Sequence, residues 1–248
     1  MTDILISEVF SAIQGEGAHV GRRQVFVRLS GCNIRCSYCD QPEALELRPG
    51  PCRIEQTPGR RDWSNVSSPL PIDAVGRAVD QLWRGVRHHS VSVTGGEPLA
   101  QSGRLADLLS LMEGKRVHLE TNGTLVAGLR RVIDRVDEVS MDLKLTSVDG
   151  QDVELETQRR FLIVAAERDV AVKIVLGPRT DADELVAALK MVSETAPGAS
   201  VFLQPVSPFG TVDAAPTPDQ VLEWHDRALA LHADVRVVPQ THKLIGQL

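Results

Sequence analysis

Residues 32–40 read Cys-Asn-Ile-Arg-Cys-Ser-Tyr-Cys-Asp, and this stretch holds three of the four cysteines in a chain of 248 residues. Three thiolates this close together are expected to converge on one metal centre and to leave a four-ligand site one ligand short. Residues 24–29 alternate apolar and polar side chains, as a strand does, and Ser30-Gly31 then allows a turn. We therefore predict a cysteine loop at the C-terminal end of a strand, holding an iron–sulfur cluster with one iron open for chemistry.

Two other interpretations of the cysteines stay open at this point. Cysteines of reducing compartments are often plain buried hydrophobic residues, although three on one short polar loop argue against this. A structural zinc ion would need a fourth ligand, such as Cys52, His19 or a distant histidine. None of these stands at a zinc-knuckle spacing from the loop.

Composition excludes several classes of protein. The net charge of −6 and the pI near 5.7 argue against a nucleic-acid surface, which would be basic. No apolar run reaches the roughly 18 residues of a membrane span, and the N-terminus lacks the pattern of an export signal. The cysteine pattern does not form a disulfide framework. We expect a protein of the reducing cytoplasm that binds neither nucleic acid nor membrane.

Strand-like and helical segments alternate along most of the chain. A first strand is expected at residues 4–10, before a glycine-punctuated loop at 13–17. Further strands are expected at 90–94, 116–121, 138–144, 170–176, 200–204 and 235–238, and helices at 72–83, 105–112, 125–136, 156–168, 181–195 and 217–232. Such alternation indicates βα units around a parallel sheet.

Polar residues recur where these strands end. They are Arg28, Thr94, Glu97, Glu120, Asp142, Lys144, Lys173 and Gln204. Because strand C-termini form one face of a βα barrel, these side chains should converge on one site. The predicted fold is α/β: a partial, open β/α barrel of about six βα units, forming a single domain over residues 1–248.

Residues 41–71 are rich in Pro, Gly and Arg and show no periodicity. We expect an irregular insertion over about 43–70, with a short helical piece near 43–47. It could cover the site, serve a partner or be a solvated loop. Its lone Cys52 is expected to be an inert thiol.

Two motifs resemble the signature of the radical S-adenosylmethionine (SAM) superfamily. They are Cys32-x3-Cys36-x2-Cys39, with Tyr38 before the last cysteine, and Gly95-Gly96-Glu97-Pro98 at a predicted strand end. The resemblance implies a radical SAM fold and a 4Fe–4S cluster whose fourth iron is chelated by SAM. Glu97 and the Gly96 backbone would hold the methionyl amino group. Reduction would cleave SAM to a 5′-deoxyadenosyl radical, chemistry that belongs to the cofactor.

Further segments resemble the 7-carboxy-7-deazaguanine synthases (the QueE family). These segments are residues 10–17, with Gln-Gly-Glu-Gly, residues 26–33, residues 120–123, with Glu-Thr-Asn-Gly, and residues 239–243, with Gln-Thr-His-Lys. The resemblance spans nearly the whole chain. It implies a homodimer that contracts the ring of 6-carboxy-5,6,7,8-tetrahydropterin with release of ammonia, on the route to queuosine and other 7-deazapurines. It also implies an electron donor such as flavodoxin or ferredoxin.

The resemblance assigns site residues position by position. For the pterin it implicates Ile13, Gln14, Gly15, Glu16, Arg28 and Thr94, and also Leu248 in a C-terminal tail, residues 240–248, that folds into the substrate site. An amide and a carboxylate can read the edge of a pterin, and Arg28 can pair with the substrate carboxylate. For SAM it implicates Tyr38, Asp40, Gly96, Glu97, Glu120, Thr121, Asn122, Asp142, Lys144 and Gln204.

One position departs from the family pattern. After Cys-Asp the family usually has Thr or Ser, whose hydroxyl binds Mg²⁺, and here the residue is Gln41. An amide oxygen can bind a hard cation, but this side chain is longer, so the role of Mg²⁺ is left open. Two other functions also stay open: a radical SAM activase that makes a glycyl radical on a partner, and a zinc-stabilised binding module.

Overall fold

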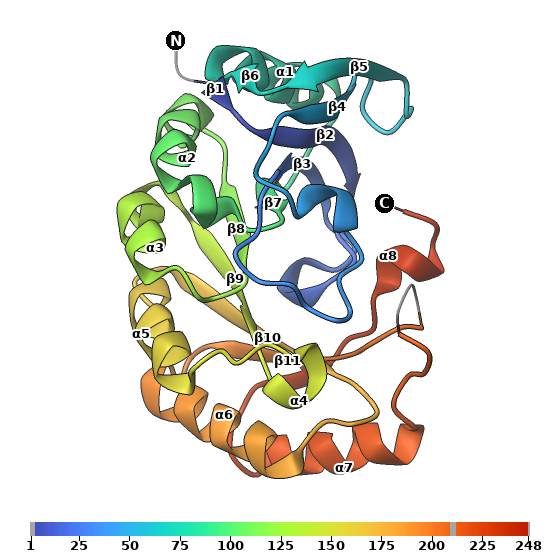
Figure 1. Ribbon diagram of the computed structural model, residues 1–248, viewed down its shortest axis with the longest axis vertical. Coiled ribbons are helices and arrows are strands. Elements are labelled where there is room, and N and C mark those ends of the chain that lie inside the picture. The colour runs from blue at the N-terminus through green and yellow to red at the C-terminus, as the bar shows by residue number, and fades with distance from the viewer. Residues whose placement is uncertain (1–2, 209–211, 248) are drawn as a thin grey trace.

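The structure is a computed structural model that describes residues 3–208 and 212–247. Within these ranges, ten strands form one curved sheet in the order β12-β11-β10-β9-β8-β7-β3-β2-β4-β5, with helices along its outer side (Figure 1). Its strands are β2 Ile6–Ile13, β3 Arg23–Leu29, β4 Gly50–Glu55, β5 Trp63–Ser68, β7 Ser90–Gly95, β8 Val117–Thr121, β9 Glu138–Leu143, β10 Asp169–Leu176, β11 Ser200–Pro205 and β12 Val235–Val237. A separate short pair joins β1 Asp3–Ile4 to β6 Leu70–Pro71.

The helices of the described ranges fall into two groups. The α-helices are α1 Ile72–Gly85, α2 Ser102–Leu109, α3 Val126–Val132, α4 Thr146–Asp149, α5 Leu155–Ala165, α6 Ala182–Thr195, α7 Pro218–Leu229 and α8 Thr241–Leu244. The 3₁₀ helices are η1 Gly17–His19, η2 Pro42–Ala44, η3 Pro98–Gln101, η4 Ser110–Met112 and η5 Ile133–Arg135. None of these helices is long and apolar enough to cross a membrane.

The parallel part of the sheet confirms the open barrel. Each strand from β3 through β7, β8, β9, β10 and β11 to β12 pairs parallel with the next. The described residues contain six βα units, each a parallel strand with the α-helix that comes after it in the chain. The pairs are β3 with α1, β7 with α2, β8 with α3, β9 with α5, β10 with α6 and β11 with α7. Val27, Val93, Leu119 and Ile174 are fully buried, as expected of parallel strands covered on both faces.

The first long strand lies antiparallel to its neighbour and is not part of a βα unit. β2 pairs antiparallel with β3, so the loop between them lies at the N-terminal end of β3. In this loop η1 contacts β10 and β11 on the other side of the barrel. The β2–β3 loop therefore lies across the floor of the barrel, and the carboxyl ends of the strands face the opposite side.

The expectation of an irregular insertion over 43–70 was wrong. β4 and β5 form an antiparallel hairpin, and β4 pairs parallel with β2, so the segment extends the sheet. The helical piece expected at 43–47 is the single turn η2. The hairpin was not recognisable because β5 reads Trp-Ser-Asn-Val-Ser-Ser and lacks an apolar face. Backbone pairing, together with the packing of Trp63 against Phe10, holds it.

Candidate functional site

A cavity of about 580 Å³ opens among the carboxyl ends of the parallel strands. All the site residues expected from the sequence line it, with two exceptions. Glu97 is buried behind its wall, and Leu248 lies outside the described residues. The polar residues of distant strands therefore converge as the barrel topology predicted.

The cysteine loop is held by hydrogen bonds to two other segments. The Cys32 N–H donates to the Leu45 carbonyl at 2.9 Å, and the Ser37 hydroxyl donates to the Val148 carbonyl at 2.9 Å. All three thiols of the loop are partly exposed, form no disulfide and line the cavity. Burial raises the pKa of the Cys36 thiol to about 11, so binding a metal centre here must release a proton.

The donor set fits a cluster with an open iron better than a four-ligand zinc ion. Cys52 is 1% exposed in β4 and does not line the cavity, and His19 does not line it either. Two of the three candidate fourth ligands for zinc, Cys52 and His19, thus do not share the cavity with the three thiols, and Cys52 is buried, as expected of an inert thiol. The third candidate was a distant histidine, and His118 and His242 do line the cavity.

The glycines of the Gly95-Gly96-Glu97-Pro98 turn allow it to lie against the cysteine loop. Gly95 has φ +145°, and a Cβ there would lie 2.1 Å from the Leu29 carbonyl oxygen. A Cβ on Gly96 would lie 2.5 Å from the Gly31 carbonyl oxygen. The Glu97 N–H donates to this same carbonyl at 2.7 Å. Side chains at either glycine would push the end of β7 away from the cysteines.

The Glu97 carboxylate lies behind the wall of the cavity, and its expected contact with SAM stays a prediction. It is fully buried, and it accepts hydrogen bonds from the Thr121 hydroxyl at 2.9 Å, the Asn122 N–H at 2.7 Å and the Leu99 N–H at 3.0 Å. The carboxylate thus joins the end of β7 to the end of β8. Thr121 and Asn122 line the cavity, so Glu97 positions residues that can touch a ligand.

The stability of the protein should depend on the ionisation of Glu97. Burial raises its pKa to about 7, although the surrounding donors favour the charged form. The folded pKa lies above the ordinary 4.5, so the folded state holds the Glu97 proton more tightly than the unfolded chain does. The stability that comes from this proton is complete below pH 4.5 and is lost as pH rises through 7. From pH 5 to pH 8, we expect the wild type to lose roughly 2 kcal/mol of unfolding free energy relative to Glu97→Gln. Urea unfolding at both pH values measures it.

Glu16→Gln is the matched control for this measurement. The pKa of Glu16 is about 2, so its contribution is constant above pH 4.5. The difference in unfolding free energy between the wild type and Glu16→Gln should therefore be the same at pH 5 and pH 8. If the difference between the wild type and Glu97→Gln were also the same at both pH values, the raised pKa of Glu97 would be contradicted.

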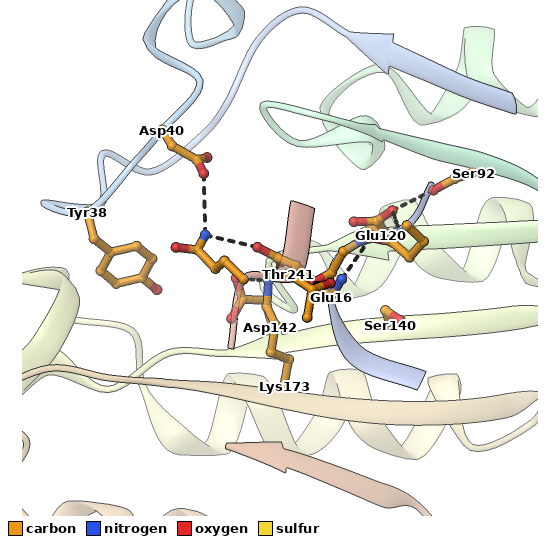
Figure 2. Close-up of polar contacts among 12 residues, drawn as sticks. Glu16, Tyr38, Asp40, Ser92, Glu120, Ser140, Asp142, Lys173 and Thr241 are labelled. Carbon is orange, nitrogen blue, oxygen red and sulfur yellow. Dashed lines mark hydrogen bonds and ion pairs between the residues drawn. The ribbon is translucent and has the colours of Figure 1, made fainter. Parts of the chain in front are cut away.

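A network of ion pairs and hydrogen bonds crosses the cavity, and Figure 2 shows the part of it around Glu16, Asp142 and Lys173. Lys173 Nζ lies 2.6 Å from Glu16 Oε2 and 3.6 Å from Asp142 Oδ2, and Lys144 Nζ lies 2.7 Å from the same Asp142 oxygen. Lys144 also donates to the Tyr38 hydroxyl at 2.9 Å. Burial alone would raise the pKa of Glu16, but the Lys173 ammonium outweighs it and lowers the pKa to about 2. Glu16 is thus a fixed carboxylate. Lys173 was expected among the strand-end residues that converge on the site, but the sequence assigned it no binding role.

The described part of the C-terminal tail, residues 240–247, packs onto the Glu16 loop. The Thr241 N–H and hydroxyl both donate to the Gly15 carbonyl at 3.0 Å. Gln240 Nε2 donates to Glu16 Oε1 at 3.0 Å, and Lys243 Nζ lies 3.3 Å from Asp40 Oδ2. A Cβ on Gly15 would lie 2.4 Å from His242, so only glycine allows this approach.

Two arginines surround a single carboxylate at one end of the cavity. Glu8 pairs with Arg28 at 3.0 Å and also with Arg53, and all three residues line the cavity. The group carries a net positive charge and can receive an anionic ligand. Arg53 was missed because it belongs to the hairpin that the sequence pattern did not reveal.

Several side chains of the cavity differ in their capacity to bind a ligand. The Gln14 amide is engaged by the protein: Nε2 donates to Gln24 and Glu120, and Oε1 accepts from the Gly15 and Glu16 N–H groups. Gln14 thus shapes the loop. By contrast, Asp142 Oδ1 and Gln204 Oε1 are buried without a hydrogen-bond partner among the described residues. These oxygens suit the donors of a bound ligand.

Comparisons with known proteins agree with this geometry. The model of the radical SAM superfamily matches residues 26–201. The 7-carboxy-7-deazaguanine synthase of Geobacter sulfurreducens is 41% identical over 98% of this chain and 97% of its own length. This chain belongs to the 7-carboxy-7-deazaguanine synthase family. The synthase of Methanopyrus kandleri is 35% identical over 97% of this chain and 92% of its own. Escherichia coli QueE shares the fold, with a TM-score of 0.55 and 21% identity over 95% of this chain and 93% of its own.

Family membership implies two cofactors, and the site fits both. The radical SAM superfamily uses a 4Fe–4S cluster and SAM, and this chain offers three partly exposed thiols on one loop beside a large polar cavity. A QueE-family site also needs room for a second ligand beside SAM. The cavity extends from the cysteines to the Glu16 loop, so it provides that room.

Proposed function

We propose that this protein is a 7-carboxy-7-deazaguanine synthase that converts 6-carboxy-5,6,7,8-tetrahydropterin to 7-carboxy-7-deazaguanine and releases ammonia. The observation that carries the proposal is one cavity with the cysteine loop at one side and the Glu16–Lys173 pair, the tail and the two arginines at the other. When bound, the cluster and SAM supply the one-electron chemistry that removes a hydrogen atom from the substrate. The product feeds queuosine or another 7-deazapurine route.

The protein's own residues bind and orient the substrate. Glu16 is ionised at every working pH and can accept two N–H groups from the edge of the pterin. Arg28, with Arg53 beside it, can receive the substrate carboxylate. Ile13, Gly15 and Thr94 line the same part of the cavity, and Gln14 holds the loop through its saturated amide. We also propose that Leu248, which lies outside the described residues, takes part in substrate binding.

A second set of residues suits SAM. Tyr38, Asp40 and the Gly96 backbone lie beside the cysteines, and Glu120, Thr121 and Asn122 end the neighbouring strand β8. Asp142 and Gln204 offer unpartnered oxygens to hydroxyl or amino donors, and Lys144 holds Asp142 in place. Glu97 accepts hydrogen bonds from Thr121 and Asn122 and so holds these two residues in position for the ligand.

The decisive experiment is anaerobic turnover. Reconstituted enzyme with the tetrahydropterin, SAM and a reductant should form 7-carboxy-7-deazaguanine and one equivalent of ammonia without any partner protein. Formation of deoxyadenosine without this product would contradict the substrate assignment and leave only the superfamily. A product that appears solely as a radical on an added protein would favour the activase. A colourless anaerobic preparation with stoichiometric zinc would favour the binding module.

The role of Mg²⁺ should be smaller here than at a hydroxyl-bearing site. Gln41 lines the cavity, and its carbonyl accepts the Ala44 N–H at 3.1 Å, so the backbone of this residue is held in the η2 turn. We propose that its longer side chain hinders the ion that a hydroxyl at this position would hold. We expect EDTA to change kcat/KM of the wild type by less than about threefold, and Mg²⁺ to stimulate Gln41→Thr by roughly tenfold. A loss above tenfold in the EDTA-treated wild type would contradict this.

The cellular setting follows from the same proposal. An iron–sulfur enzyme requires the reducing cytoplasm and an electron donor of low potential, such as flavodoxin or ferredoxin. We also propose that the protein is a homodimer. Equilibrium sedimentation of the anaerobic enzyme tests this assembly directly.

A further inference from the structure

Three ligand-type side chains gather at the floor of the barrel, away from the cysteines. His19 lies in η1 of the β2–β3 loop, His89 directly precedes β7, and Glu138 is the first residue of β9. Each offers a ligand atom, and these atoms all lie within 4.8 Å of one another. Three segments far apart in the sequence therefore bring two imidazoles and a carboxylate together.

Glu138 places one buried carboxylate oxygen directly against His19. The side chain is 8% exposed, and Oε1 pairs with Arg116 at 2.5 Å. Oε2 lies 2.7 Å from His19 Nε2, which is an ion pair when His19 is protonated, but no described residue donates a well-aligned hydrogen bond to this oxygen. A metal cation could take the place of the His19 proton between these two atoms. A cation bound beside both atoms would satisfy the buried oxygen.

The remaining ring nitrogens support the same geometry. His89 Nδ1 contacts Ser90 Oγ at 3.1 Å, which leaves Nε2 to serve as a ligand. His118 stands behind His19, with the ring centroids 4.8 Å apart and the planes at 81°. Both nitrogens of His118 are engaged, with Ser140 Oγ at 2.7 Å and Gln24 Nε2 at 3.3 Å. His118 therefore orients the His19 ring and lines the cavity on its other side.

We propose that His19, His89 and Glu138 form a site for one divalent transition-metal ion of the zinc class, separate from the iron–sulfur site. Two imidazoles and a carboxylate, with water as the fourth ligand, form a donor set that suits zinc; Mg²⁺ and Ca²⁺ prefer oxygen alone. Ligands on a tetrahedral zinc ion lie roughly 3.4 Å apart, so small side-chain rotations complete the site.

A metal ion at this site would hold three segments of the chain together. The ion would fasten the β2–β3 loop, which carries Gln14 and Glu16 into the cavity, to the bases of β7 and β9. The site does not depend on the identity of the substrate, and it can exist whether or not the pterin is turned over.

The experiment measures metal content and needs no activity assay. Holoenzyme with a full cluster is incubated with zinc chloride, freed of excess by gel filtration and analysed for zinc and iron by mass spectrometry. We expect about one zinc per chain with unchanged iron in the wild type. The zinc content should fall at least tenfold in His19→Asn and in Glu138→Gln. Bound zinc should also raise the Tm of the wild type and not that of either variant.

His225→Asn is the matched control, because His225 lies on α7 near the Val235 carbonyl and outside the cluster of ligands. This variant should keep its zinc. Should His19→Asn fail to fold, anomalous diffraction at the zinc edge on wild-type crystals locates the ion without any variant. The proposal is overturned if the wild type holds no zinc, if the variants keep it, or if the anomalous peak lies at the cysteines.

Discussion

Replacing Cys36 by alanine is expected to abolish the cluster and all turnover while leaving the chain folded. The thiol is partly exposed on the cysteine loop, and the hydrogen bonds that hold that loop come from Cys32, Ser37 and Gly31, so the fold does not depend on the Cys36 sulfur. Without it two thiols remain. We expect iron content to fall below a tenth of the wild-type value and kcat/KM to fall at least 10⁴-fold, because the entire rate enhancement depends on the cofactor. Iron analysis and anaerobic kinetics measure both.

Cys52→Ala is the matched control for this variant. Cys52 is buried in β4 and does not line the cavity, so its loss removes packing alone, at a cost of roughly 1 kcal/mol. The control should be brown, with wild-type iron and activity. If Cys52→Ala lost the cluster, or if Cys36→Ala retained it, the assignment of the three-cysteine loop as the cluster site would be wrong.

Replacing Lys173 by methionine should damage the substrate side of the site and the stability together. Lys173 is the cation that holds the pKa of Glu16 near 2, and it also approaches Asp142. Its loss leaves a partly buried carboxylate without a cation, which costs roughly 2 kcal/mol. The Glu16 loop and the tail bound to it should also shift, and we expect kcat/KM for the pterin to fall at least 100-fold. Urea unfolding and steady-state kinetics measure the two effects.

A second substitution separates the two effects. In Lys173→Met/Glu16→Gln no unpaired charge remains, so most of the lost stability should return, while the pterin activity should stay low because Glu16 is absent. Lys190→Met, on the exposed face of α6, controls for the loss of a lysine and should behave as the wild type. Equal instability of the single and double variants would contradict the importance of the Glu16–Lys173 pair.

The sequence predicted the barrel well because its strands are strongly apolar and two of its helices, α6 and α7, carry clear signals at their N-termini. Asp181 caps α6 by accepting from the Asp183 and Glu184 N–H groups, and Thr217 forms a capping box with Gln220 at the start of α7. Such signals are local, so they are readable without knowledge of the fold. The convergence of strand-end residues followed from topology alone.

The parts that could not be predicted depend on contacts between distant segments. Glu97 was assigned to a ligand because the motif places it at a strand end, but three donors from η3 and β8 turn its carboxylate into the protein. Arg53 reaches the cavity because the hairpin pairs with β2, a register that no periodicity reveals. His89 lies outside every motif, and its approach to His19 and Glu138 exists only in the folded chain.

The added hairpin also determines what the sheet presents at its margin. Without β4 and β5, the margin on that side would be β2, whose residues are buried almost throughout and which would offer other chains an apolar strand with free backbone groups. Instead the margin is β5, where four of six residues are Ser or Asn, and the opposite margin is β12, only three residues long. The hairpin therefore protects the folded enzyme against edge-to-edge aggregation, and solubility depends on a segment whose Arg53 also lines the catalytic cavity.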